Sequence, residues 1–556
     1  MESHSLNDSL IVEKKSKSSG PKWIWIIVLF TILVFSLAFG LAWISNRRSG
    51  VDGWTAFLVA LLVGIGIIWV MWRLIKTESP PRWLGYLTIG AAFLHLAMGV
   101  LWYVALPVWG HESQAEQSGY VMSDASKRDQ AAWKLAASNK SLADAFRNNR
   151  ATDQYGGMLY LSALAYRYLG GANHQPLLIV VLTASFSSLA ILFTWAFAFR
   201  AWGLPAANLS AIALAVFPDA VLLGSSQMRE AFTISLSSAA FYGLFRYSGN
   251  RTWKNLLWLI LPLALFLPFS PPFAALLFVM LALSALALSK DTYPTNRSHW
   301  FWVVVIGMVL LILVGLWFAL GQFTPERMSN PIEMINWWLR KSAEYQAHLT
   351  RLASGWLQKT FKSTPGWMHI PILVGYGTVQ PFLPAALTVG SHAPIWPRIV
   401  LWRSVGWTIL LGFLLYAPFL AFRKKEISAF TRVFCLVVWL GIFIAAFRGG
   451  GDMWDNPRYR TTFAGLQIAL AAWAWVEHRR VFDPWLRRAL LALGAILIWF
   501  LPWYLRRYFD INWPVSSLIL TLVFGTCSAA FVVFLDWLWE RMKKHRQASI
   551  SETHHK

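Results

Sequence analysis

The chain has 556 residues, of which 57% are hydrophobic and only 13% are charged, and its mean hydropathy is +0.48. A soluble protein carries about a quarter charged residues, so this composition excludes an ordinary water-soluble fold and indicates a membrane protein. The net charge of +23 would suit nucleic acid. The basic residues, however, form short clusters between apolar segments, as they do in cytoplasmic loops, and we expect no nucleic-acid partner.

Apolar segments of about 20 residues, the length that crosses the hydrocarbon core, recur along the whole chain. Backbone amides in lipid must pair within their own segment, so these segments should be helices. We predict an all-α polytopic membrane protein with about 12–14 transmembrane helices and two structured outer loops. The expected spans are 23–45, 54–75, 83–107, 176–199, 205–223, 229–246, 255–268, 270–289, 300–320, 399–421, 431–448, 462–477, 486–504 and 515–537.

The orientation follows from the charged loops and from a proline cluster at 268–272. This cluster breaks the apolar run 255–289, either as a hairpin tip or as a kink. The positive-inside bias favours the hairpin, because an even number of spans places both basic termini in the cytoplasm. The long hydrophilic segments 108–175 and 321–398 then face the outside of the cell membrane.

The chain therefore divides into five parts. In order, these are a disordered cytoplasmic tail (1–22), two extra N-terminal spans (23–82), a transmembrane core (83–480), the C-terminal spans (481–540) and a second cytoplasmic tail (541–556).

Both long segments should be structured. Residues 127–137 are helical by propensity, and Ser141 is a helix N-cap with Asp144 at the third helical position. Residues 157–169 are apolar but short for a span, so we expect a helix at the membrane interface. Residues 331–362 carry tryptophans among basic residues, which suits a helix on the membrane surface.

Two carboxylates open the first outer segment, Asp124 and Asp129. A carboxylate here can act as general base toward an acceptor hydroxyl, or bind a divalent cation beside a phosphate. The alternative is a solvated helix start with Asp124 as its cap.

Arginines at membrane edges form the second group of candidates. Arg229 can hold a phosphate, and Glu230 suits the positive end of a helix dipole; alternatively, the two residues only tether helices. Arg458 and Arg460, on either side of Tyr459, lie on the face where positive charge is disfavoured and require an anionic partner, either a phosphate or lipid headgroups.

A composition typical of a turn marks the remaining candidates. Asp153 and Tyr155 precede Gly156 and Gly157 in the first outer segment. We count both side chains as candidate binding residues.

Four short motifs then occur in a familiar order. They are Asp129, Trp133 and Ala137 at four-residue spacing, Tyr-Arg-Tyr-Leu-Gly at 166–170, Phe-Pro-Asp at 217–219, and Pro-Arg-Tyr-Arg-Thr-Thr-Phe-Ala-Gly-Leu at 457–466. In this order the chain resembles the GT-C superfamily of membrane glycosyltransferases over about residues 83–480, in particular the family-39, protein-mannosyltransferase-like bacterial members. Two departures are Gln130, where many members continue with Glu, and Thr462 or Phe463, where the last motif has Pro.

The resemblance implies an enzyme that passes a sugar from a polyprenyl-phosphate carrier to a glycan, lipid or protein acceptor on the outer face. It makes Asp129 or Asp124 the general base. Because Gln130 stands where many members have Glu, the resemblance does not decide whether the site binds a divalent cation. With the arginines above, we expect Arg229, Arg458 and Arg460 to hold the phosphate. The alternatives are a transporter or flippase for lipid-linked glycans, an O-antigen ligase or polymerase type that needs no carboxylate base, and a structural membrane subunit.

Overall fold

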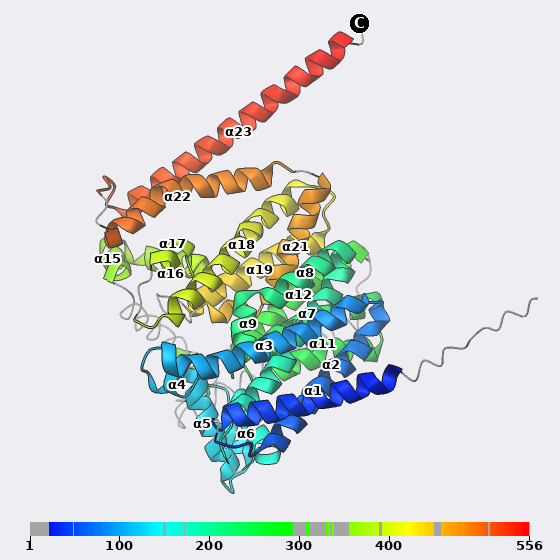
Figure 1. Cartoon of the computed structure of the whole chain (residues 1–556). Helices are drawn as coiled ribbons and strands as arrows, with labels where there is room; N and C mark the ends of the chain where they lie inside the picture. Colours follow the sequence, from blue (N-terminus) through cyan, green and yellow to red (C-terminus); the bar gives the residue numbers. More distant parts are fainter. Residues whose placement is uncertain are drawn as a thin grey trace, which may run out of the picture.

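The computed structural model describes residues 22–47, 49–147, 152–171, 173–292, 355–388, 392–449, 457–481, 483–509 and 512–554, with isolated positions between 306 and 337. All regular structure in these ranges is helical (Figure 1). The first half contains α1 (Lys22–Ser45), α2 (Trp54–Ile75), η1 (Lys76–Glu78), α3 (Arg82–Trp109), α4 (Gln114–Gln117), α5 (Ser123–Ala137), η2 (Leu142–Phe146), α6 (Gly157–Tyr168), α7 (Pro176–Trp202), α8 (Leu204–Val216), α9 (Pro218–Gly224), α10 (Glu230–Gly249), α11 (Trp253–Phe266) and α12 (Pro271–Thr292). The second half contains α15 (Gly355–Ser363), α16 (Gly366–Val379), α17 (Leu383–Thr388), α18 (Ile395–Arg423), α19 (Ala429–Arg448), α20 (Arg458–Thr461), α21 (Ala464–Val481), α22 (Trp485–Phe509) and α23 (Leu518–His554).

The predicted multi-pass, all-α membrane architecture is confirmed. Among the described residues, 9 helices are long and apolar enough to cross a membrane, or up to 10 if a bent pair counts as one span. The bent pair is α8 and α9, which meet at 56°. Pro218 explains this break of the expected span 205–223, because proline restricts the residue before it to extended backbone.

Four other expected spans have no counterpart among the qualifying helices of the described residues. The segment 300–320 lies outside the described residues, and α11 is only 14 residues long. Helices α10 and α21, expected as spans 229–246 and 462–477, do not qualify as apolar spans. Both are buried among other helices, so the hydroxyls of α10 and Gln467 of α21 need not face lipid.

The centre of the bundle is α7, which is apolar on every side and almost wholly buried. A helix that is apolar on every side suits either lipid or a protein interior, and here it is the interior. It packs against α2, α3, α8 and α10. At the far end of α2, the buried carboxylate of Glu78 accepts hydrogen bonds from Arg200 of α7, at 2.6 and 3.0 Å, and from the Tyr242 hydroxyl of α10 at 2.8 Å. Helix α2 is therefore integrated into the core, whereas α1 packs mainly on α2.

Helices α11 and α12 form the hairpin favoured by the charge rule. The backbone N–H of Gly157 in the first outer segment donates to the carbonyl of Pro268 at 3.1 Å, so the break lies at the level of that segment. From there α12 departs to pack along α19. Its Phe273 stacks on Tyr459, and Met280, two turns later, reaches Gly441.

The first outer segment forms a small helical cap at one end of the bundle. Figure 1 shows α4, α5 and α6 gathered there. The expected helix 127–137 is part of α5, and Ser141 caps η2 through its hydroxyl as predicted. The expected interface helix 157–169 is α6, which is largely buried and packs on α5.

Two further expectations concern the C-terminal half. Most of the expected surface helix 331–362 lies outside the described residues. Helix α23 does not end with the expected span at 537 but continues to His554, through most of the segment 541–556 that we expected to be a tail. Arg487 and Arg488 of α22 pair with Asp536 of α23 at 2.8 and 2.9 Å, which holds the last two helices together.

Candidate functional site

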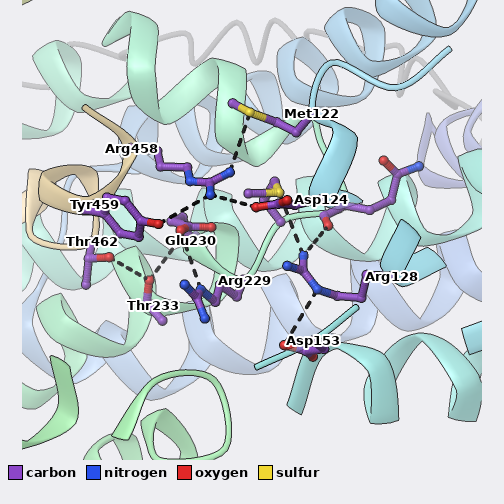
Figure 2. A network of polar contacts seen from close by, with 12 residues as sticks. Met122, Asp124, Arg128, Asp153, Arg229, Glu230, Thr233, Arg458, Tyr459 and Thr462 are labelled. Atoms are coloured by element: carbon purple, nitrogen blue, oxygen red, sulfur yellow. Dashed lines mark hydrogen bonds and ion pairs between the residues drawn. The ribbon is translucent and has the colours of Figure 1, made fainter. Parts of the chain in front are cut away.

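The centre of the site is an ion pair between residues 334 positions apart. Asp124, in the first turn of α5, accepts a hydrogen bond from Arg458 of α20 at 2.8 Å (Figure 2). The Asp124 side chain is 47% exposed, whereas that of Arg458 is 7% exposed. The predicted cap role of Asp124 is wrong, because Met122 is the N-cap and no side chain caps this helix. Asp124 is thus a carboxylate that is held in place on one side and open to solvent on the other.

Three arginines at the site, Arg458, Arg448 and Arg229, lie over tyrosine rings, and we call them the row of cations. The guanidinium carbons of Arg458 and Arg448 lie 5.2 and 5.5 Å from the ring centre of Tyr459. The guanidinium carbon of Arg229 lies 5.4 Å from the ring centre of Tyr155. A cation over an aromatic face is partly stabilised by the electrostatic field of the ring.

A second ion pair supports the row from behind. Arg128 of α5 lies 3.7 Å from Asp153, and both side chains are buried. The other oxygen of Asp153 accepts the backbone N–H of Leu159 at 2.9 Å, near the N-terminus of α6. Asp153 therefore positions the loop that carries Tyr155, and it does not face the opening.

The glycines after Tyr155 are required by the local backbone. Gly156 has φ +80°, a conformation that favours glycine. A Cβ on Gly157 would lie 2.3 Å from the carbonyl oxygen of Pro268, so only glycine allows this close approach to the α11–α12 hairpin. The predicted turn is thus a fixed bend that aims Tyr155 at Arg229.

A narrow cavity opens beside the row of cations, with about 190 Å³ of empty space including its mouth. It lies between the start of α10, the start of α12, and α20. Its lining residues are Arg229, Glu230, Thr233, Ser270, Phe273, Tyr459 and Thr462. Glu230 opens α10, where its charge is favourable to the helix dipole, and one of its oxygens lies 3.6 Å from Arg229.

Asp129 lies away from this cavity and is unsuited to the predicted role of base. Its side chain is 1% exposed. It accepts hydrogen bonds from the hydroxyls of Tyr120 at 2.7 Å and Tyr166 at 2.8 Å, and contacts a ring nitrogen of His174 at 2.9 Å. A carboxylate that is shielded from water and engaged by three side chains cannot be reached by an acceptor hydroxyl. Asp129 instead ties α5 to α6 and to the start of the following span.

Arg460 also points away from Asp124, contrary to its predicted phosphate role beside Arg458. Its guanidinium carbon lies 3.4 Å from the ring centre of Trp407, and it faces the buried Asp219 at 3.9 Å. Asp219 is in addition bonded to Arg403 of α18. Arg460 thus belongs to a buried network that joins α9, α18 and α20.

The cations control the ionisation of Asp124. Partial burial alone would raise its pKa, but the charge and hydrogen bond of Arg458, with smaller effects of Arg128 and Arg229, lower that pKa below its usual value. Burial raises the pKa of the Tyr155 hydroxyl. At neutral pH the site therefore contains an ionised Asp124 and a neutral Tyr155.

Three stretches predicted from the sequence thus meet at this site, namely 124, 229–230 and 458–459. Sequence reasoning missed Arg128 and Arg448. The signal was present for Arg448, since it is a cation at the end of an apolar span, like those that singled out Arg229 and Arg458. No group of three metal-ligating side chains occurs in the part of the chain that the structure describes, which leaves out Asp452 and Asp455.

Comparisons with known proteins give limited information. No known protein family and no curated protein matches the chain. The archaeal oligosaccharyltransferase AglB from Archaeoglobus fulgidus, solved with an inhibitory peptide and a dolichol-phosphate, is similar at 13% identity and a TM-score of 0.37, covering 81% of this chain and 56% of that one. The apo form of the Archaeoglobus fulgidus oligosaccharyltransferase is similar at 13% identity and a TM-score of 0.39, covering 80% of this chain and 56% of that one. The chain thus spans little more than half the length of these proteins, and likeness at this level assigns no activity.

Proposed function

We propose that this protein is a membrane glycosyltransferase that moves a sugar from a polyprenyl-phosphate-linked donor to an acceptor hydroxyl on a glycan, lipid or protein. The observation that carries the proposal is the half-exposed carboxylate of Asp124, held by Arg458 beside Arg448 and Arg229. A base that is open to water and a row of cations next to it are the two groups that this transfer needs.

The reaction assigns a role to each side of the site. The acceptor oxygen attacks the anomeric carbon of the sugar while its proton passes to Asp124. The bond between that carbon and the phosphate oxygen breaks, and the phosphate leaves with the electron pair. Arg458, Arg448 and Arg229 stabilise the negative charge that develops on the leaving group, since guanidinium groups bind phosphate with charge-assisted hydrogen bonds.

The ion pair gives the donor a way to activate the base. In the unliganded site Arg458 lowers the pKa of Asp124, which makes it a weak base. A donor phosphate that binds Arg458 competes with this carboxylate and releases it. Asp124 then regains basicity only when a donor is present.

The proposal includes an orientation. The segment with α4–α6 and the site lie at one end of the bundle, and Figure 1 shows the start of α1 and the end of α23 directed toward the other end. With the basic loops inside, the site faces the outside of the cell membrane, both termini are cytoplasmic, and membrane lipids surround the helices.

The test uses the purified protein in lipid nanodiscs, with membranes as the source of acceptor. The substrates are ten-carbon prenyl phosphates that carry mannose, glucose, galactose, N-acetylglucosamine or arabinose, and the readout is the release of free prenyl phosphate by mass spectrometry. We expect release with at least one donor, its loss in Asp124→Asn, and a strong but still measurable reduction in Arg458→Gln. The matched controls are Glu112→Gln and Arg398→Gln, two exposed residues in or beside the same outer segments.

The outcomes separate the alternatives. Loss in Arg458→Gln together with full activity in Asp124→Asn would identify a ligase or polymerase type without a carboxylate base. Absence of release with every donor would reject the transferase. Transport of the same donors across the bilayer of vesicles would then indicate a flippase.

A further inference from the structure

The cavity beside the row of cations contains a carboxylate oxygen that accepts no hydrogen bond from the described residues. The Glu230 side chain is 3% exposed. Its Oε2 atom has no hydrogen-bond partner among the described residues, whereas Oε1 faces Arg229. A buried carboxylate oxygen without a donor is costly to maintain, so this position is suited to a ligand that donates a hydrogen bond.

The other walls favour a neutral ligand with several hydroxyls. Thr233, Ser270 and Thr462 line the cavity with hydroxyl groups, which both donate and accept. Thr233 and Thr462 already contact each other at 3.4 Å, and together they form a continuous polar wall with the Glu230 carboxylate. An anion would be repelled by that carboxylate.

Two aromatic residues complete the lining of the cavity. The rings of Phe273 and Tyr459 stack nearly in parallel, with centroids 6.3 Å apart and an interplanar angle of 6°. The two rings offer apolar contacts to a ligand, while the carboxylate and the hydroxyls can pair with sugar hydroxyls. The space enclosed inside the cavity is about 10 Å³, room for one water-sized group, so a single hydroxyl at the edge of a sugar ring can enter it.

We propose that this cavity binds the hydroxyl-bearing edge of the transferred sugar, with Glu230 accepting a hydrogen bond from one sugar hydroxyl. The inference rests on the proposed function, since it places the sugar beside the phosphate that Arg229 and Arg458 hold. Glu230 thereby determines which sugar is accepted, and Asp124 remains the base on the solvent side.

The experiment separates the sugar from the phosphate. Isothermal titration calorimetry on the protein in nanodiscs measures the Kd of the bare ten-carbon prenyl phosphate and of the five sugar-bearing forms. The increment due to a sugar is the ratio of these two Kd values. In the wild type we expect at least one sugar to tighten binding about tenfold or more, the range for a hydrogen bond to a charged group.

Glu230→Gln should abolish this increment. It should leave the bare prenyl phosphate bound at least as tightly, because a negative charge beside Arg229 is removed. A deoxy analogue that lacks the paired hydroxyl should bind less tightly to the wild type but equally well to Glu230→Gln, as a double-mutant cycle requires. Thr233→Val, a smaller change, should lower the increment in part, and Glu112→Gln is the matched control for removal of a carboxylate.

Two kinds of failure can be told apart. If the bare prenyl phosphate does not bind the wild type, the proposed function fails. If it binds and the increment persists in both Glu230→Gln and Thr233→Val, each with wild-type thermal unfolding, the sugar assignment is overturned while the proposed function stands. An increment that is absent for all five sugars overturns the assignment as well.

Discussion

The two carboxylates of α5 should respond to the same substitution in opposite ways. Asp124→Asn removes the proposed base from a side chain that is 47% exposed. The introduced amide keeps an oxygen that can accept from Arg458, and Asp124 is half exposed, so we expect the free energy of unfolding to change by only about 1 kcal/mol. Loss of a general base costs roughly 10²–10⁴-fold in rate. This corresponds to about 3–5 kcal/mol of activation free energy.

Asp129→Asn should destabilise the fold and spare the chemistry. The carboxylate of Asp129 accepts hydrogen bonds from two tyrosines and contacts His174. In the variant an NH2 group, which can only donate, replaces one of its two oxygens. Hydrogen bonds to a charged group contribute about 1.5–3 kcal/mol each, so we expect a loss of roughly 3 kcal/mol or more. Activity per folded molecule should stay close to that of the wild type.

Two measurements on each variant decide this comparison. Thermal unfolding in detergent, followed by tryptophan fluorescence, reports stability, and release of prenyl phosphate per folded molecule reports chemistry. Full activity in Asp124→Asn would refute its role as base. An inactive Asp129→Asn variant that unfolds like the wild type would return Asp129 to the mechanism.

The remaining predictions concern the charged groups around this helix. Arg458→Gln should weaken the binding of bare prenyl phosphate about tenfold to a hundredfold, measured by calorimetry, because one charge-assisted hydrogen bond is lost; equal weakening in the exposed Arg398→Gln would mean that only net charge matters. The pKa of Asp124 is lower in the folded protein than in the unfolded chain, where it is near 3.8. The ion pair therefore stabilises the fold above pH 3.8, and this stabilisation is lost as the pH falls through the pKa of the folded state. The acid limb of kcat/KM should accordingly move to higher pH in Arg458→Gln, and an unmoved limb would show that another group titrates. Asp219→Asn should reduce stability by about 3–5 kcal/mol, because it leaves Arg403 and Arg460 buried without their carboxylate; thermal unfolding checks this, and a wild-type transition would contradict it.

The sequence carried enough information to predict the helices and the meeting of distant stretches, because candidate residues at the ends of apolar spans must lie near a membrane edge. The sequence could not show which of two nearby residues of the same type faces the site. Asp124 and Asp129 are five residues apart on one helix, which places them about 140° apart around its axis, and Arg458 and Arg460 are about 200° apart. Only one member of each pair can therefore face the site.

The choice within each pair depends on tertiary neighbours. Asp129 faces inward because the buried hydroxyls of Tyr120 and Tyr166 donate hydrogen bonds to it. Arg460 faces inward because it lies over the Trp407 ring and near the Asp219 carboxylate. Nothing in the local sequence of α5 or α20 shows where those partners lie. The polar but buried helix α10 illustrates the same limit, since its hydroxyls are matched by helices distant along the chain.

The hydrogen bond between Gly157 and Pro268 joins two parts of the candidate site. On one side it fixes the bend that presents Tyr155, and on the other it fixes the first turn of α12, which supplies Ser270 and Phe273. The loop that presents Tyr155 to Arg229 and the cavity beside it therefore depend on the same contact. A methyl group added at Gly157 would push both walls apart at once, although it touches neither the base nor any arginine.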